Sequence, residues 1–378
     1  MSFWGVKSLE TRLKRAYAAI IFVAIALAVP AAQAQGLSYY WQSIKGHLAV
    51  LNAAKPVQDW LSDAKTPSAL KARLELAQRI RAYAVSELHL PSNASYTRYA
   101  DIGRSAVVWN VVAAPPDALT LKTWCYPIAG CAGYQGYYAE ADARAAAEAL
   151  HAQGLEVAVY GVPAYSTLGY MNWAGGDPLL SSFIHYPEGE LARMLFHELA
   201  HQVVYAQDDT VFNESYATAV ERIGAQTWLA TQAGEAARQD YATYDARRQQ
   251  FRQLTLAARR HLEKIYATTP ADTAYAASKN IAMEQFRSDY AQLKSTWGGY
   301  AGYDAWVARA NNASFGALAA YDELVPGFEA LYAREKRAHS SAWPGFYAAV
   351  KRLATLPLAE RHAALQSASA PIETTLNQ

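Results

Sequence analysis

This sequence contains little cysteine, no excess of charge of either sign and no concentration of basic residues. Its 34 Lys and Arg residues nearly balance its 33 Asp and Glu residues, and the basic ones form no stripe. A nucleic-acid-binding surface needs such a stripe, so this class of protein is excluded. The composition, with 52% hydrophobic residues, is also not that of a disordered chain, a collagen or a multi-pass membrane protein. At 378 residues, the chain can bury one large core or two smaller ones.

The N-terminal segment differs in kind from the rest of the chain. Several basic residues precede an almost uncharged apolar run over 16–29, and the small residues Ala32 and Ala34 follow. This order is typical of a secretory signal peptide, here residues 1–34, cleaved after Ala34. The apolar run is shorter than the ~20 residues that cross a bilayer as a helix, although an uncleaved anchor is the alternative. We therefore expect an exported protein, periplasmic or secreted, with no stable membrane insertion after cleavage.

Only two cysteines are present, Cys125 and Cys131, in a segment with a proline and a glycine between them. In an oxidising compartment such a close pair more often forms a small disulfide than a metal site. No second Cys/His pair lies nearby, so a zinc-finger interpretation is weak. Whether the pair is oxidised stays open at this level.

Two kinds of pattern alternate along the remaining chain. Apolar residues recur every three or four positions over 39–90, and the pattern is helical again from residue 187 onward. Short β-like runs at 106–113 and 155–162 enclose an alanine-rich helix near 139–153, which together predict a small sheet. The fold class expected is therefore α+β and mostly α-helical.

Beyond residue 230, two long stretches at 232–267 and 271–296 are helical, with a break at Thr269-Pro270. A long helical hairpin is the simplest interpretation. The chain has no internal repeat and no long low-complexity linker, so we expect one unit over 35–378. Its parts are an N-terminal helical part (35–105), the sheet with the metal-site helices (106–230) and a C-terminal helical part (231–378).

The segment His197-Glu198-Leu199-Ala200-His201 carries the strongest chemical signal. Histidines four apart lie on one face of a helix, where both can reach one metal ion. Glu198 points to the same side and can take a proton from a water that the metal activates, without being a ligand. The opposite side is apolar, so the helix is expected to be buried. Burying unpaired polar groups costs a few kcal/mol, and a zinc ion removes that cost.

A catalytic zinc site needs three protein ligands and an open fourth position. Glu214 is the candidate for the third. A polar turn at 206–211 separates it from the first helix, and Asn213 is a good N-cap for a second helix that would carry Glu214 in its first turn. The alternative is that Glu214 only satisfies the preference for acidic residues at a helix N-terminus. Glu221, two turns further on the same face, is expected to support a ligating histidine.

This arrangement resembles the gluzincin type of zinc peptidase, in which a Glu on the following helix is the third ligand. It departs from the thermolysin-like pattern, because Thr218 stands where that pattern has an Asp. No third His follows at metzincin spacing. The resemblance implies a zincin-like core with one Zn²⁺ per chain.

Nearly the whole chain resembles one family, bacterial proteins described as putative aminopeptidases. The segments that carry this resemblance are 39–42, 122–125, 162–169, 177–180, 297–300 and 311–313, together with the two segments around His197 and Glu214. The resemblance implies a peptide or protein substrate. The family name describes an activity that is itself largely inferred from the zinc motif.

Catalysis also needs a donor for the oxyanion, commonly a Tyr or His. The chain has 26 tyrosines. Tyr321 and Tyr165 are the candidates, and His185 is a third; each is also a plausible packing residue. The segment 155–169 is expected to be an edge strand that pairs with an extended peptide.

Alternatives remain at the level of function. An aminopeptidase needs an acidic group for the substrate's amine, and Glu188, Glu190 and Asp177 are no better than solvated surface charges in this respect. An endopeptidase therefore fits equally well. A zinc-binding envelope protein without turnover is disfavoured by the presence of Glu198, since a structural site needs no base. Zinc hydrolysis of a non-peptide amide is not separated from peptidase action, and the oligomeric state is open.

Overall fold

The structure is a computed structural model, and it describes residues 37–126, 130–169, 172–268, 273–320 and 323–369. The signal peptide expected over 1–34 lies outside the described residues. Within the described part, no helix is both long and apolar enough to cross a membrane. The predicted α+β, mostly helical fold class is confirmed.

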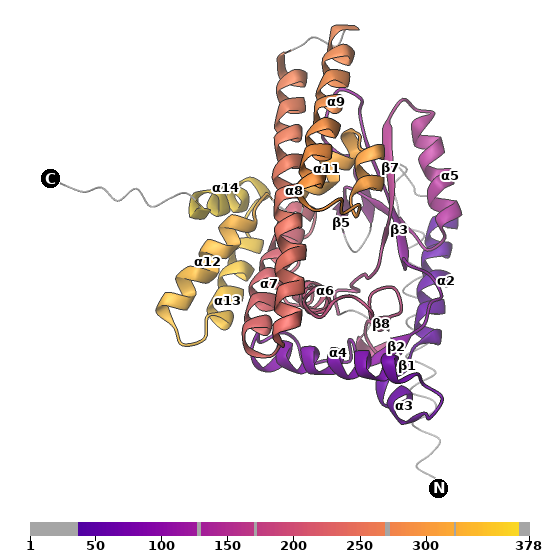
Figure 1. Cartoon of the computed structure of the whole chain (residues 1–378), viewed down its shortest axis with the longest axis vertical. Helices are drawn as coiled ribbons and strands as arrows, with labels where there is room; N and C mark the ends of the chain where they lie inside the picture. The colour runs from indigo at the N-terminus through magenta and orange to yellow at the C-terminus, as the bar shows by residue number, and fades with distance from the viewer. Residues whose placement is uncertain (1–36, 127–129, 170–171, 269–272, 321–322, 370–378) are drawn as a thin grey trace, which may run out of the picture.

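The N-terminal part is helical, as predicted. It contains α2 (Leu37–Ala53), α3 (Val57–Ser62) and α4 (Ser68–Ser86). In α4 the buried side chains, among them Leu74, Ala77 and Ile80, recur at helical spacing and form one apolar face. This face packs against the central helix α6 (Glu188–Ala200). Figure 1 shows α4 crossing the base of the molecule, while α2 follows its side.

The main sheet has the order β6-β3-β7, and both pairings are antiparallel. Its strands are β3 (Val108–Ala114), β6 (Gln135–Tyr137) and β7 (Glu156–Val162), and α5 (Glu140–His151) covers one face. The two β-like runs and the helix between them are thus confirmed. Within the described residues β7 pairs with β3 alone, so it is an edge strand, as expected for its segment.

Two smaller sheets complete the strand content. One has the order β1-β2-β8 and consists of β1 (Lys55–Pro56), β2 (Arg98–Ala100) and β8 (Leu179–Leu180). The other is a hairpin of β4 (Trp124–Tyr126) and β5 (Gly130–Ala132), closed by a disulfide between Cys125 and Cys131. The pairing of the two cysteines, which the sequence left open, is thus a disulfide in the structure. A short 3₁₀ helix, η1 (Asn172–Ala174), precedes β8.

The centre of the molecule is the pair formed by α6 and α7 (Thr210–Thr231). Most residues of both helices are buried in the largest hydrophobic cluster. The N-cap of α7 is Asp209, whose side chain accepts a hydrogen bond from the Phe212 amide at 3.0 Å. The prediction of Asn213 as N-cap was therefore wrong, and Glu214 lies in the second turn of the helix rather than the first.

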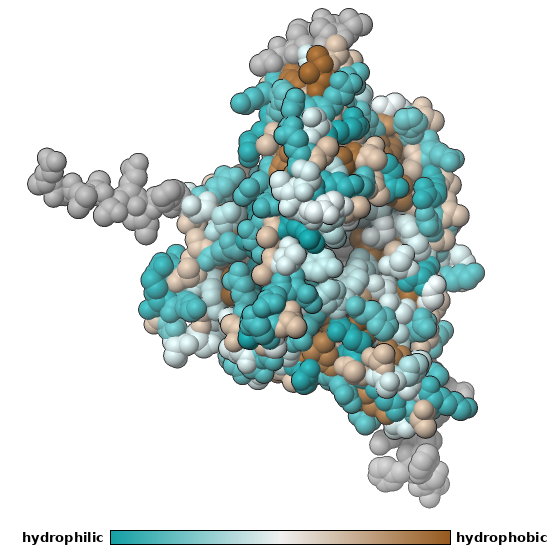
Figure 2. Space-filling model, in the orientation of Figure 1, coloured by the Kyte–Doolittle hydropathy of each residue, from teal (hydrophilic) through white to brown (hydrophobic). Residues whose placement is uncertain are grey.

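The C-terminal part contains the expected long hairpin, α8 (Glu235–Thr268) and α9 (Thr273–Thr296), which forms a second hydrophobic cluster and projects from the body in Figure 1. The break predicted at Thr269-Pro270 lies outside the described residues. The remaining helices are α10 (Asp304–Arg309), α11 (Asn312–Ala320), α12 (Val325–Ala338), α13 (Trp343–Ala354) and α14 (Leu358–Ser369). The face in Figure 2 is mostly hydrophilic, and its hydrophobic residues form small separate patches.

Candidate metal centre

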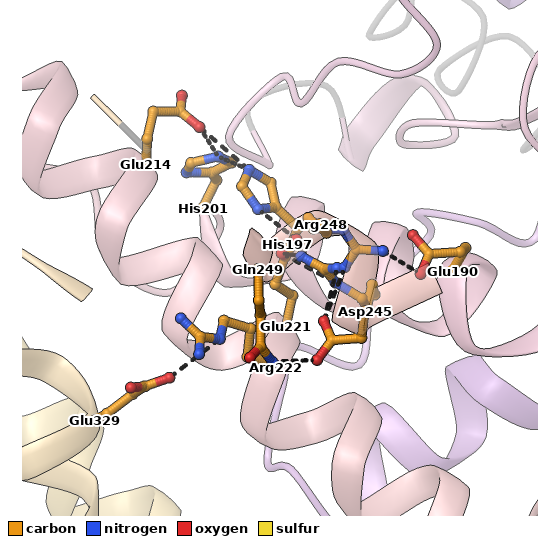
Figure 3. A network of polar contacts seen from close by, with 11 residues as sticks. Glu190, His197, His201, Glu214, Glu221, Arg222, Asp245, Arg248, Gln249 and Glu329 are labelled. Carbon is orange, nitrogen blue, oxygen red and sulfur yellow. Dashed lines mark hydrogen bonds and ion pairs between the residues drawn. The ribbon is translucent and has the colours of Figure 1, made fainter. Parts of the chain in front are cut away.

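The two histidines of α6 lie one turn apart and point to the same place. Their Nε2 atoms are 3.2 Å from each other, and the rings meet edge to face. The helix brings them there because its buried residues, including Leu195, Phe196 and Leu199, fix its opposite side in the core. Figure 3 shows both rings directed at the carboxylate of Glu214 on α7.

Glu214 completes a set of three ligand atoms. Its Oε2 atom lies 3.2 Å from His197 Nε2 and 3.8 Å from His201 Nε2. One ligand atom from each residue lies within 4.8 Å of the others. Ligands bound to a tetrahedral zinc at about 2.0–2.1 Å are about 3.3 Å from one another. The three side chains therefore have the spacing of a zinc site, and their donor set of two imidazole nitrogens and a carboxylate suits that ion.

Burial and charge act in opposite directions on these groups. Burial lowers the pKa of His197, but hydrogen bonds to Glu214 and Glu221 and their charges raise it well above its usual value. Burial lowers the pKa of His201 to about 4, although the charge of Glu214 opposes this. His201 is thus held as a neutral imidazole, the form that binds a metal. Two carboxylates converge on His197, so the site is also one that attracts a cation.

A further set of residues fixes the ring of His197 from behind. Glu221 Oε2 lies 3.1 Å from His197 Nδ1, as expected from its position on α7. Arg193 donates to Glu221 Oε1 through its Nε at 3.1 Å, and its Nη1 lies 4.0 Å from Asp245 on α8. Burial raises the pKa of Glu221, but Arg193 and His197 outweigh this and lower it to about 2. Glu221 is therefore a permanent carboxylate that orients His197.

Sequence reasoning missed Arg193. The available signal was its position one turn before His197, on the same face of α6. A buried arginine there needs a carboxylate partner, and Glu221 is that partner.

Glu198 is buried beside the three ligand side chains, at 8% exposure, and is not part of the ligand set. Burial raises the pKa of Glu198 to about 7; the charge of His197 lowers it, while those of Glu214, Asp177 and Glu221 raise it further. Such a carboxyl group can exchange a proton near neutral pH, which a general base must do.

Of the candidates for the oxyanion donor, the structure describes Tyr165 and His185. Tyr165 directs its hydroxyl to His47 Nδ1, at 2.6 Å, and its ring packs against Tyr138. Tyr321 lies outside the described residues, and His185 is exposed.

Tyr134, between β5 and β6, was not singled out by the sequence. Burial and the charges of Glu214 and Glu198 raise the pKa of Tyr134 well above 10. Its phenol group is therefore within electrostatic reach of both carboxylates. Nothing in a chain with 26 tyrosines distinguishes it beforehand.

The three acidic residues considered for an amine site are not solvated surface charges, so that interpretation was wrong. Glu188 accepts a hydrogen bond from Trp228 at 3.0 Å, and Glu190 pairs with Arg248 at 2.5 Å. Asp177 is only 2% exposed and accepts hydrogen bonds from the Thr167 amide and from Gln202. Folding neutralises or encloses carboxylates that look exposed in the sequence.

The fold and the site define an α+β, mainly helical protein with a candidate three-ligand metal centre between two central helices. The model of one family, described as "Putative aminopeptidase", matches residues 38–365. The chain belongs to this family. No curated protein and no solved structure matched it.

Proposed function

We propose that the protein is a zinc-dependent peptidase that holds one Zn²⁺ per chain with His197, His201 and Glu214. The observation that carries this proposal is the convergence of their three ligand atoms, with separations of 3.2, 3.2 and 3.8 Å, beside the buried Glu198. The family description supports peptidase activity. The same description suggests that the enzyme removes N-terminal residues, and we include this activity in the proposal.

The roles of the residues follow from their positions. A Zn²⁺ held by His197, His201 and Glu214 would supply Lewis-acid chemistry, polarising a carbonyl group and lowering the pKa of a water molecule to ~7. Glu198 would accept a proton from the attacking water and pass it to the leaving amine. Tyr134, whose pKa is raised by burial and by the charges of Glu214 and Glu198, is the tyrosine that we propose as hydrogen-bond donor to the oxyanion. Glu221 and Arg193 keep His197 in its ligating orientation.

The edge strand β7 is proposed to hold the substrate backbone. Burial raises the pKa of Tyr160 on this strand to about 12, and the charge of Glu214 contributes to this, so Tyr160 lies within electrostatic reach of Glu214. A free strand edge can pair with an extended peptide. We expect the amides of residues 156–162 to become protected from hydrogen exchange when a peptide-like inhibitor binds. Unchanged hydrogen exchange of all these amides would exclude β7 as the strand that holds the substrate backbone.

Export remains part of the proposal. It is supported by the basic, apolar and small-residue order of the first 34 residues and by the disulfide, because disulfides persist in oxidising compartments.

The test is hydrolysis of a mixed peptide library by the wild-type protein and by Glu198→Gln, with the zinc content of both measured. The amide keeps the shape of Glu198 and removes its basicity. We expect equal zinc and a loss of about 10²–10⁴-fold in cleavage rate for the variant. Zinc in both proteins with cleavage by neither would instead favour a zinc-binding protein without turnover or a hydrolase of non-peptide amides. Equal cleavage by both would exclude Glu198 as the base.

A further inference from the structure

A cavity of about 340 Å³ has His201 among its lining residues. It is lined by residues 201–205 and 207, at the end of α6 and in the loop that follows, and by Leu168 on the other side. Ligand pockets occupy about 300–1,000 Å³, so this volume suits one or two side chains rather than a long peptide. His201 also belongs to the proposed metal centre, so the cavity and that centre share one residue.

We call this cavity the His201 pocket. Its first wall contains Gln202 and Leu168, and hydrogen bonds from neighbouring segments hold this wall in place. Gln202 accepts a hydrogen bond from Asn93 at 2.7 Å and donates to Ser95 and to the buried Asp177, at 3.1 and 3.3 Å. Asp177 also accepts from the amide of Thr167, which precedes Leu168. Leu168 itself has a positive φ of 55°, a strained conformation of the kind that clusters at binding sites. The wall is therefore preorganised.

The second wall, at 205–207, is tied to the metal centre. Asn213, which is 2% exposed, makes two hydrogen bonds of 2.7 Å with the backbone of Ala206. Its Oδ1 accepts from the Ala206 amide, and its Nδ2 donates to the Ala206 carbonyl. Asn213 directly precedes Glu214. On the outer side, Asp208 accepts a hydrogen bond from the Cys131 amide of the disulfide hairpin at 2.6 Å. Asn213 therefore connects the position of this wall to that of Glu214, the proposed third ligand.

The chemistry of the lining is uncharged. Among the described residues that line the pocket, none is Asp, Glu, Lys or Arg, and its polar residues besides His201 are Gln202, Gln207 and Tyr205. A charged side chain that entered would lose water without gaining a partner of opposite charge. Leu168, Val203 and Val204 supply apolar surface. The pocket therefore selects for neutral side chains.

We propose that the His201 pocket binds the uncharged side chain of one of the two residues that flank the scissile bond. This proposal rests on the proposed peptidase function and specifies its substrate class. Asp177, Asn93 and Asn213 are positioning residues that shape the pocket.

The test uses Gln207, which lies at the rim and is exposed, in the zinc-loaded full chain. Gln207→Glu and Gln207→Lys place opposite charges on side chains of similar length. Peptides that vary one residue on either side of the cleaved bond are compared by kcat/KM. We expect the wild type to disfavour Asp, Glu, Lys and Arg at one of these positions. Gln207→Glu should then improve Lys and Arg peptides about two- to fivefold, the strength of an exposed ion pair, and Gln207→Lys should improve acidic ones.

The matched control is the same pair of substitutions at Gln153, an exposed residue just after α5, which should leave the preference unchanged. If the wild type cleaves charged and uncharged peptides equally, or if the two Gln207 variants share its preference, the pocket proposal is overturned while the peptidase function stands. If the zinc-loaded wild type cleaves no peptide, both are overturned.

Discussion

The metal centre and the His201 pocket lie side by side but are built in different ways. The three proposed ligands stand on two regular helices or, for His201, directly at the end of one, and the buried faces of these helices pack together in the core. The pocket is walled by loops, and its shape depends on hydrogen bonds between segments that are far apart in sequence, such as Asn93 with Gln202 and Asp208 with Cys131. The helical half is therefore expected to determine metal affinity, and the loop half to determine substrate preference.

The largest expected effect comes from Glu221→Gln, which removes the carboxylate behind His197. We expect zinc affinity to fall about 10–100-fold, the usual cost of losing such a partner, and competition with a chelator of known affinity measures it. The variant also removes the nearer carboxylate partner of Arg193 and leaves it only Asp245, at 4.0 Å, which destabilises the fold. The double variant Arg193→Gln/Glu221→Gln should regain thermal stability without regaining zinc affinity. If zinc affinity returns with stability, Glu221 is a structural residue and not a positioning one.

A second effect tests the packing of the helix pair. Gly224 on α7 lies so close to α6 that an added Cβ would stand 2.7 Å from Leu88 and 2.8 Å from Phe196. Gly224→Ala therefore forces the side chains of Leu88 and Phe196 to move and should cost about 1–3 kcal/mol of unfolding free energy, seen as a lower Tm. Zinc affinity should fall with it, since Phe196 adjoins His197.

The control for this change is Gly234→Ala, where an added Cβ meets nothing within 4 Å. It should leave Tm unchanged or raise it slightly by reducing the entropy of the unfolded chain. Equal effects of the two substitutions would show that close packing of α6 and α7 is not what stabilises the site.

The smallest effect is expected in the loop half. Gly130 has a φ of +77°, and an added Cβ would stand 2.4 Å from Asp208 Oδ1. Gly130→Ala should separate the disulfide hairpin from the loop at 205–208 and raise KM a few-fold, with zinc content unchanged. Gly103→Ala introduces the same left-handed strain at φ +62°, but its added Cβ meets nothing within 4 Å. Comparing the two variants therefore separates the effect of the steric clash with Asp208 from that of the backbone strain. A loss of zinc in Gly130→Ala would contradict the division between the two halves.

The same division explains what the sequence could predict. His197, His201 and Glu221 were found because a helix places residues three and four apart on one face. That rule needs only the local sequence. The strand β7 and the long hairpin of α8 and α9 could also be predicted, because alternating or helical apolar patterns are likewise visible in the local sequence.

Residues whose role depends on neighbours that are distant in the chain escaped prediction. Asn213 has the sequence properties of an N-cap, but its amide is used by Ala206 instead, and Asp209 caps the helix. Asp177 appears as a surface charge until three segments enclose it. Tyr134 lies between β5 and β6, far in sequence from Glu198 and Glu214, whose charges raise its pKa. In each case tertiary contacts decide the role.

The most direct test of the central claim is the zinc content of the purified wild-type protein and of His201→Ala after exposure to excess zinc and removal of weakly bound metal. The account predicts one zinc per wild-type chain and a large loss in the variant, because two remaining ligands do not hold the ion. A wild-type protein that retains no zinc, or a variant that retains as much as the wild type, would contradict it.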